Sequence, residues 1–491
     1  MLQRRHLLLS SLFATYSLSG CGGSADAASA VAGSEGPLGA APPNPAPTPR
    51  PPAPTPPTPT PPVPSPAPSP TPSPPSPAPA PPSPPPTAPP PPPAVYDRGN
   101  LPAWVPLTQG EAALVPMQNR LQDVAFLDEP RLGNNSTFVF AAYSGGAYNP
   151  YYGAWGAHVI HGGGHAATQD NSVFIADFNT LRFERIGGPT MLSSFQAYED
   201  AIRSGGFPDD ESNPREVAPS VPGSAHTYDC LLILPPEVAG DPYGALIRPV
   251  AGAIGVGVSR STGWSHAFTF GDRRWQRFST NHARSWPPGG SCAYDTQRQR
   301  IWPIAADNVP WLMSLDVRSR AWTNSGGGPQ SIAAYPDMVY SAYCAHRDVI
   351  AIAAHRESAT EANFYWFSAA GSGSERTRVR FTNGPLPPAN WGRGSLVYVP
   401  DIARLIWFTL QGGDYYYEID VPANPANDWT WVARPITGAA RPSILTPKPY
   451  SSVYKRLDYA PQLKSLVWVT AQDTSASYSF GGRVVAIRVA P

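Results

Sequence analysis

Short apolar runs recur along the C-terminal part of the chain, and they are rich in the residue types typical of strands. The clearest copies begin repeats of roughly 50 to 65 residues, which is the period expected of a propeller blade with variable loops. These copies lie at residues 225–229, 291–295, 339–343, 395–399 and 451–454, with an earlier one at 138–143.

Further strand-like runs follow each start, so that every repeat has room for four strands. Second strands are predicted at 300–304 and 405–408 and a third at 311–316, while fourth strands open on Trp275, Trp322 and Trp429. Four strands per repeat is the composition of a propeller blade. We therefore predict an all-β protein, a β-propeller of six four-stranded blades, with seven as the alternative if residues 123–130 hide a further piece.

The last repeat lacks an obvious fourth strand, because its third strand at 482–487 ends almost at the C-terminus. Residues 102–107, which contain Trp104, have the pattern of a fourth strand with no repeat of their own. We predict that this N-terminal strand completes the last blade, which would close the ring and remove an open sheet edge.

Glycine-containing segments carry a resemblance to a known family. Residues 158–164 read His-Val-Ile-His-Gly-Gly-Gly, and a strand ending at Asp177 and an aromatic at Phe183 follow. This order resembles the Kelch and galactose-oxidase-like propellers, and residues 411–413 with Asp420 and Trp429 are a looser second match. Other copies lack the double glycine, so the repeats are degenerate. The resemblance implies the propeller fold for residues 95–491.

The N-terminus has the pattern of an export signal. Arg4 and Arg5 precede an apolar run at 7–18, and Leu18-Ser19-Gly20-Cys21 resembles the lipobox of bacterial lipoproteins. That resemblance implies a signal peptide at 1–21 and a lipid on Cys21, which anchors the protein to a membrane. Gly22 in place of a retention signal points to the outer membrane, on either its periplasmic face or the cell surface.

Residues 22–94 form a linker whose segment 42–93 is almost entirely Pro, Ala, Thr and Ser. Such a composition cannot bury enough apolar surface to fold, so we expect a disordered stalk. Dense proline favours the extended polyproline II form. At ~3.1 Å per residue the stalk would reach on the order of 150 Å.

Charge and cysteine content narrow the functional classes. The formal net charge is zero, whereas nucleic-acid binding would require a basic stripe. Export implies an oxidising compartment, yet only Cys230, Cys292 and Cys344 follow Cys21. An odd number leaves at least one thiol unpaired within the chain, although Cys230 could pair with either of the others across blades. We expect a monomer.

Candidate binding residues gather on one predicted face of the propeller, where loops between second and third strands meet loops between blades. Aromatic platforms beside polar groups suit sugars, although exposed loops are polar by default. The candidates are His161, His165, Asp170, Trp264, His266, Trp286, His355, Trp391, Arg393 and Asp414.

The sequence contains weaker evidence for metal binding or catalysis than for ligand binding. His161 and His165 could reach one metal ion, but no third ligand is spaced nearby, so we predict no cofactor while leaving copper and calcium open. Familiar hydrolase and nucleotide motifs are missing from the sequence. We therefore favour a binding module for a glycan or an envelope protein over its alternative, a carbohydrate-active enzyme of copper oxidase or lyase type, whose residues need not form a local motif.

Overall fold

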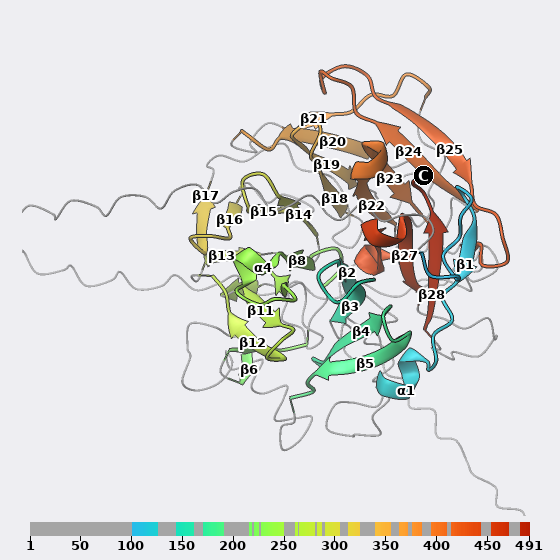
Figure 1. Ribbon diagram of the computed structural model, residues 1–491. Coiled ribbons are helices and arrows are strands. Elements are labelled where there is room, and N and C mark those ends of the chain that lie inside the picture. Colours follow the sequence, from blue (N-terminus) through green and yellow to red (C-terminus); the bar gives the residue numbers. More distant parts are fainter. Residues whose placement is uncertain are drawn as a thin grey trace, which may run out of the picture. The chain divides into compact units, whose positions relative to one another are not determined.

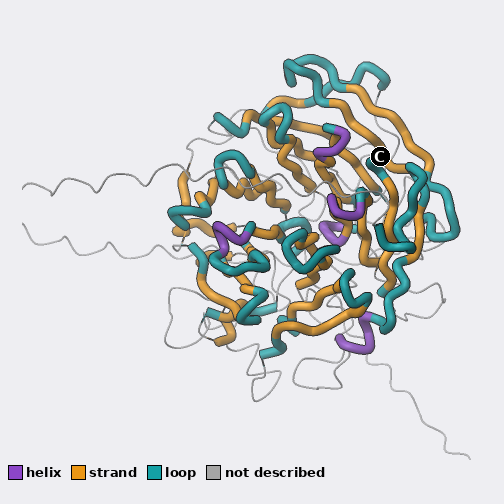
Figure 2. The backbone as a smooth tube through the Cα atoms, viewed as in Figure 1, coloured by secondary structure: helices purple, strands orange, loops and turns teal. Residues whose placement is uncertain are grey.

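The computed structural model of the chain describes eighteen segments, all within one compact unit, Val95–Pro491. The described residues are 101–125, 144–161, 170–190, 216–218, 220–224, 227–249, 261–263, 265–279, 282–286, 290–304, 313–324, 339–354, 363–371, 376–384, 394–409, 414–442, 453–470 and 482–491. Strands form most of these segments, and the helices are short (Figure 2).

Six four-stranded antiparallel sheets confirm the predicted β-propeller (Figure 1). Blade 1 contains β2 (Gly145–Asn149), β3 (Ala157–His161), β4 (Val173–Asp177) and β5 (Arg182–Gly187). Blade 2 contains β8 (Leu232–Leu234), β9 (Ala245–Arg248), β11 (His266–Thr269) and β12 (Arg274–Arg277). Blade 3 contains β14 (Ser291–Asp295), β15 (Arg300–Ile304), β16 (Met313–Asp316) and β17 (Ala321–Asn324).

The remaining blades repeat the same order from the axis outward. Blade 4 contains β18 (Val339–Cys344), β19 (Val349–Ala354), β20 (Asn363–Ser368) and β21 (Thr377–Arg378). Blade 5 contains β22 (Ser395–Val399), β23 (Arg404–Phe408), β24 (Tyr415–Asp420) and β25 (Thr430–Pro435). Blade 6 contains β26 (Leu457–Ala460), β27 (Ser465–Thr470), β28 (Arg483–Arg488) and the N-terminal β1 (Ala112–Leu114).

Elements outside the blades are small. Two hairpins pair β6 (Glu216–Ala218) with β7 (Val221–Pro222) and β10 (Ser261–Gly263) with β13 (His282–Trp286). Among the described residues, the helices are α1 (Leu121–Ala125), α4 (Pro236–Ala239), η4 (Pro400–Ile402), η6 (Tyr454–Arg456) and η7 (Pro461–Leu463). In the described part of the chain, no helix is long and apolar enough to span a bilayer.

The innermost strands form a closed ring, since each of β2, β8, β14, β18, β22 and β26 contacts its two neighbours in that order. In blades 1, 2 and 6 the innermost strand begins after the predicted segment: β2 starts at Gly145 instead of 138, β8 at Leu232 instead of 225, and β26 at Leu457 instead of 451. The predicted residues 138–143 lie outside the described residues. In blade 6, the turn η6 precedes the strand and carries Lys455 toward the axis.

An N-terminal strand closes the last blade, as predicted, but it is not the predicted segment. The closing strand is β1, which pairs with β28 so that Ala112 faces Ile487 and Leu114 faces Val485. Residues 102–107 form a turn instead, in which the Val105 amide donates to the Pro102 carbonyl oxygen at 2.9 Å. Prolines at both ends of that segment remove two amide donors that a strand would need.

The core consists of apolar layers between neighbouring blades. Strand β23 shows how it is built, because its alternate residues enter different layers: Leu405 and Trp407 pack toward blade 4, whereas Ile406 and Phe408 pack toward blade 6. This is the two-residue period of a strand covered on both faces. Burial on both sides explains why the strands read as nearly continuous apolar runs.

Four of the hairpin turns next to the axis repeat a backbone shape without repeating a sequence. Turns 296–299, 345–348, 400–403 and 461–464 join the innermost strand to the second strand in blades 3 to 6. Their last residues are Gln299, Asp348, Ala403 and Lys464, and each has a left-handed φ between 50° and 53°. We call these four turns, together with residues 150–156 and 235–244 of blades 1 and 2, the inner turns.

Candidate functional site

Five of the six blades carry a tyrosine at the same position, one residue before the end of the innermost strand. These are Tyr148, Tyr294, Tyr343, Tyr398 and Tyr459, and blade 2 has Ile233 there. Strand register places all six residues at one depth along the axis, beside the inner turns. The fold thus collects a ring of aromatic side chains at one end of the channel.

Some of these tyrosines bind the preceding blade. The Tyr148 hydroxyl lies 2.8 Å from Gln462 Oε1 in the inner turn of blade 6, and the Tyr459 hydroxyl donates to Asp401 Oδ2 at 2.7 Å in blade 5. Tyr398 stacks on His346 with ring centroids 5.6 Å apart. These contacts tie neighbouring blades together. Four tyrosines of the set also line a cavity, together with the nearby Tyr151: Tyr148, Tyr294, Tyr343 and Tyr398.

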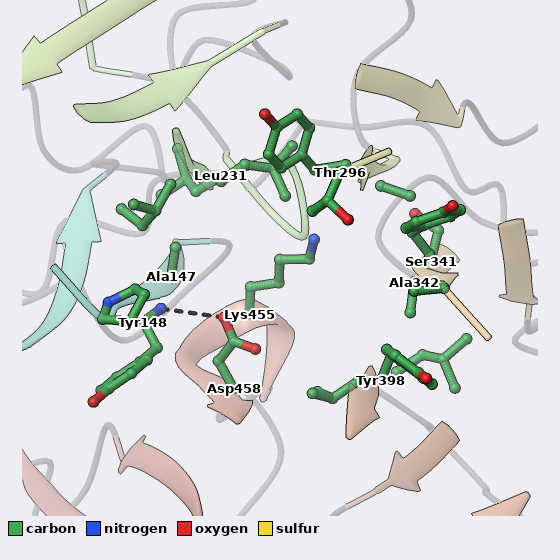
Figure 3. A pocket seen from close by; sticks show the side chains of 18 of the residues that line it. Ala147, Tyr148, Leu231, Thr296, Ser341, Ala342, Tyr398, Lys455 and Asp458 are labelled. Atoms are coloured by element: carbon green, nitrogen blue, oxygen red, sulfur yellow. Dashed lines mark hydrogen bonds between the residues drawn. The ribbon is translucent and has the colours of Figure 1, made fainter. Parts of the chain in front are cut away.

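That cavity, which we call the axial pocket, has a volume of about 400 Å³ and lies on the axis at the inner-turn end (Figure 3). Apolar and aromatic residues of blades 1 to 5 make most of its wall. Blade 6 supplies Lys455 and Asp458. Its other lining residues include Ala147, Tyr148, Tyr151, Leu232, Ala293, Tyr294, Thr296, Ser341, Tyr343, Val397 and Tyr398.

Lys455 provides the positive charge of the axial pocket. Its side chain extends from η6 into the cavity (Figure 3), and its Nζ donates to the Cys292 carbonyl oxygen at 2.6 Å. An ammonium group has three donors, so two remain for other acceptors. Because the residue is only 8% exposed, these donors face the pocket interior and not bulk water.

Asp458 lies beside Lys455 in the wall of the pocket and is partly buried. Its Oδ2 accepts a hydrogen bond from the Tyr148 amide at 3.1 Å, and its Oδ1 accepts one from the Tyr459 amide at 2.8 Å. Burial raises the pKa of Asp458, while the Lys455 ammonium opposes that shift. The two backbone donors fix the orientation of the carboxylate, and its remaining lone pairs can accept from a ligand hydroxyl.

Asp229 is a second carboxyl group near the axis, behind Ser291 and Ser341. Its Oδ2 accepts from the Ser291 hydroxyl and, at 3.3 Å, from the Ser341 amide, while Oδ1 has no hydrogen-bond partner. Burial raises the pKa of Asp229 to about 7, against the effect of the Lys455 ammonium. The Lys455 ammonium therefore interacts with the carboxyl groups of both Asp229 and Asp458, which offset its charge.

Three of the candidates predicted from the sequence are buried inside the propeller. His161, Asp170 and His266 are at most 2% exposed. His161 and His266 lie beside the same residue, Arg248, whose positive charge lowers the pKa of both after the larger effect of burial. The structure thus brings these two histidines together, but in the protein interior instead of on a loop surface.

The His161 ring uses both of its nitrogens within the fold. Its Nδ1 is 3.1 Å from the Ser172 carbonyl oxygen and its Nε2 is 3.4 Å from Arg248 Nη1. Burial and the guanidinium lower the pKa of His161 to about 3. A cation beside this ring would meet the Arg248 charge, and within the described ranges no three His, Cys, Asp or Glu side chains form a metal-binding group.

The remaining candidates are separate from this cluster. Asp414 lies near the surface, with its Oδ2 3.4 Å from Arg441 Nε. Trp286 belongs to β13, where only the backbone is described. The other predicted site residues, His165, Trp264, His355, Trp391 and Arg393, lie outside the described residues, as do most of the predicted loop face and Cys21.

The cysteines of the propeller are buried free thiols. Hydrogen bonding to the Cys292 thiol raises the pKa of Cys230 well above its usual range, and burial adds to this effect. Burial raises the pKa of Cys344 to about 12. Because the thiolate is the nucleophilic form and a high pKa keeps the thiol protonated, neither Cys230 nor Cys344 is suited to act as a nucleophile.

Sequence reasoning missed the axial pocket. The repeated strand-start segments already contained Tyr294, Tyr343 and Tyr398, and their recurrence near strand ends was the available signal. Lys455 had no comparable signal, because it lies in η6, a short turn before the innermost strand of blade 6. The pocket also lies at the opposite end of the channel from the predicted loop face, since antiparallel strands alternate their connections between the two ends.

The fold and this geometry define a six-bladed β-propeller with a pocket on its axis. No family model and no curated protein sequence matches the chain.

Proposed function

We propose that the protein is a lipid-anchored binding module of the bacterial cell envelope, and that its axial pocket binds a neutral sugar of a glycan. The observation that carries this proposal is the combination of tyrosine rings with Lys455 and Asp458 around one cavity of about 400 Å³. Small-ligand pockets commonly occupy roughly 300–1,000 Å³ and combine an apolar wall with a few placed polar groups.

The polar groups suit hydroxyls better than a charged ligand. Lys455 can donate to a ring or hydroxyl oxygen, and Asp458 can accept from a hydroxyl. Because the ammonium already faces carboxyl groups, an anion would upset the charge balance of the pocket. Tyrosine faces would cover the apolar side of a sugar ring. A neutral polyhydroxylated ligand satisfies both kinds of group.

The N-terminal segment supports the placement of this module. Its lipobox-like sequence ending at Cys21 supports a lipid anchor in the outer membrane, and the proline-rich residues 42–93 support a spacer that holds the propeller away from it. The glycine-containing repeat at 158–164 supports a relationship to the Kelch and galactose-oxidase-like propellers. A Cys21→Ser variant should move from the membrane fraction to the soluble fraction on cell fractionation.

A glycan array of the wild-type protein, followed by calorimetric titration of its hits, tests the binding function. Thr296 is exposed in the inner turn of blade 3 and lines the axial pocket, so Thr296→Trp should obstruct the mouth and abolish binding. Lys455→Met should weaken binding by about tenfold or more, because it removes a buried charged donor.

Matched variants separate the pocket from general surface effects. Gln297 is the next residue of the same turn, is exposed and does not line the pocket, so Gln297→Trp should bind normally. Lys464→Met alters a lysine of the same blade that contacts Asp401 instead of the pocket. If no sugar binds, or if Thr296→Trp binds as well as wild type, the proposed site is wrong, and a protein partner becomes the better explanation.

A further inference from the structure

A second hollow lies at the inner-turn end of the propeller, at the boundary of blades 1 and 2. It has a volume of about 390 Å³. Three aromatic rings and three hydrogen-bonding side chains line it, together with Gly153 and Gly271: Tyr152, Tyr243, Phe270, Asp177, Asn179 and Arg273. Aromatic rings beside a carboxylate, an amide and a guanidinium are the groups that recognise sugars in general.

The floor of this hollow is held rigidly. Asn179 Nδ2 donates to the Tyr152 carbonyl oxygen at 2.8 Å, and Asn179 Oδ1 accepts from the Trp155 amide at 2.9 Å. Asp177 Oδ1 accepts from the Asn179 amide at 2.8 Å. At Gly153 a Cβ atom would lie 2.6 Å from Asn179 Nδ2, so the backbone approaches this side chain as closely as glycine allows. A fixed floor lowers the entropic cost of binding.

The rings above that floor also contact one another. Tyr152 and Tyr243 have centroids 5.7 Å apart, and Tyr152 and Phe270 are 6.0 Å apart. Tyr243 is nevertheless 43% exposed. The planes of these two pairs of rings are inclined by 49° and 65°, and Phe270 is buried. The cluster therefore presents the Tyr243 ring to solvent, held in place by Tyr152, which packs on Phe270.

Tyr151 joins this hollow to the axial pocket. It lines the axial pocket, while the next residue, Tyr152, lines the second hollow. The Tyr151 ring also packs on the loop that carries Tyr243, since its Cδ2 would lie 3.2 Å from a Cβ at Gly244. Tyr151 is 39% exposed. Aromatic surface thus continues from the axis to the boundary of blades 1 and 2.

We infer that the protein binds a neutral oligosaccharide chain whose terminal sugar enters the axial pocket and whose following sugars cross Tyr151 to a second subsite on Tyr152, Tyr243 and Phe270. This inference rests on the proposed function. It adds the length of the recognised glycan and the direction in which the chain leaves the axis.

Calorimetric titration with N-acetylglucosamine, with glucose and with the β-1,4-linked oligomers of each in increasing length tests the second subsite. Affinity for at least one series should rise with chain length in the wild-type protein. Tyr243→Ser should lower the affinity for the longer oligomers of that series about tenfold, the effect of one aromatic platform, and should leave monosaccharide binding unchanged. Tyr415→Ser is the matched control, because Tyr415 is 45% exposed on β24 of blade 5.

The outcomes distinguish the two levels of the proposal. If no sugar of any length binds, the proposed function fails and this inference fails with it. If sugars bind with an affinity that ignores length, or if Tyr243→Ser and Tyr415→Ser behave alike, only the second subsite is wrong. A synthetic peptide of stalk residues 61–80 is the competing probe, because aromatic grooves also bind polyproline. If the peptide binds and Tyr243→Ser abolishes that binding, while no oligosaccharide binds, the ligand of this hollow is a proline-rich segment and not a glycan.

Discussion

Two polar clusters in the described part of the propeller differ in whether they line one of the two cavities described above. The first, between blades 1 and 2, contains Thr227, His161, Arg248 and His266, and we call it the closed cluster. There the Thr227 hydroxyl donates to the His161 carbonyl oxygen and accepts from the Gly145 amide, both at 2.8 Å. The second cluster lines the axial pocket, where Lys455 has donors to spare.

Both clusters contain buried groups with strongly shifted pKa values, namely His161 at about 3 and Asp229 at about 7. Shifted pKa values often mark functional sites, but structural networks produce them too. The feature that separates the clusters is an open volume beside unused hydrogen-bonding capacity. We therefore expect the closed cluster to govern stability and the axial pocket to govern binding.

The largest expected effect is on the closed cluster. Thr227→Val keeps the side-chain shape but leaves the Gly145 amide and the His161 carbonyl without this partner. Because each buried group loses its hydrogen bond, the free energy of unfolding should fall by about 3 kcal/mol, while glycan binding stays unchanged. Chemical denaturation measures the change. Thr323→Val, at an exposed position of β17, should stay within about 0.5 kcal/mol of wild type.

Acidification should also act through the closed cluster. The pKa of His161 is about 3 in the fold, below the ordinary unfolded value near 6.5, so the unfolded chain binds more protons between these values. Stability is therefore lost as pH falls from about 6.5, by about 1.4 kcal/mol per pH unit for this histidine.

The variant His161→Gln isolates that contribution, because Asp229, whose raised pKa acts in the opposite direction, is present in both proteins. Denaturation at several pH values between 5 and 7 should give a variant that is less sensitive to acid than wild type by this slope. His346→Gln, whose pKa is lowered less, should change the slope less. Equal slopes for all three proteins would contradict the assigned burial of His161.

The smallest effect compares two tyrosines at the same register position. Tyr459 does not line the pocket and donates to Asp401, so Tyr459→Phe should lower the unfolding free energy by about 1 kcal/mol and leave binding unchanged. Tyr294 lines the pocket, so Tyr294→Phe should weaken glycan binding several-fold with little effect on stability. If Tyr459→Phe weakened binding and Tyr294→Phe lowered stability, the assignment of Tyr459 to blade contacts and of Tyr294 to ligand binding would be wrong.

Particular residues show how far prediction from sequence extended. Repeat spacing and Trp275 and Trp322 in fourth strands led correctly to six blades. The sequence predicts the closing strand at 102–107, where Trp104 matches the tryptophans of other fourth strands. The actual strand, Ala112–Leu114, is short and contains two alanines, so its sequence has little strand signal. The sequence places His161 and His266 next to loop residues, which predicts a surface position. It does not show that both side chains pack beside Arg248 of another strand in the protein interior.

The amino-acid pattern was sufficient for the all-β class and favoured six blades over seven, because a strand buried on both faces needs an apolar run and a ring of blades needs a regular spacing. The location of the pocket, by contrast, follows from the three-dimensional fold. Lys455, Tyr151 and Tyr294 are far apart in the chain and meet because the ring closes and the inner turns share one end of the axis. The local hydrophobic pattern of the sequence predicts whether a residue is buried, but closure of the ring of blades determines which buried groups line a cavity.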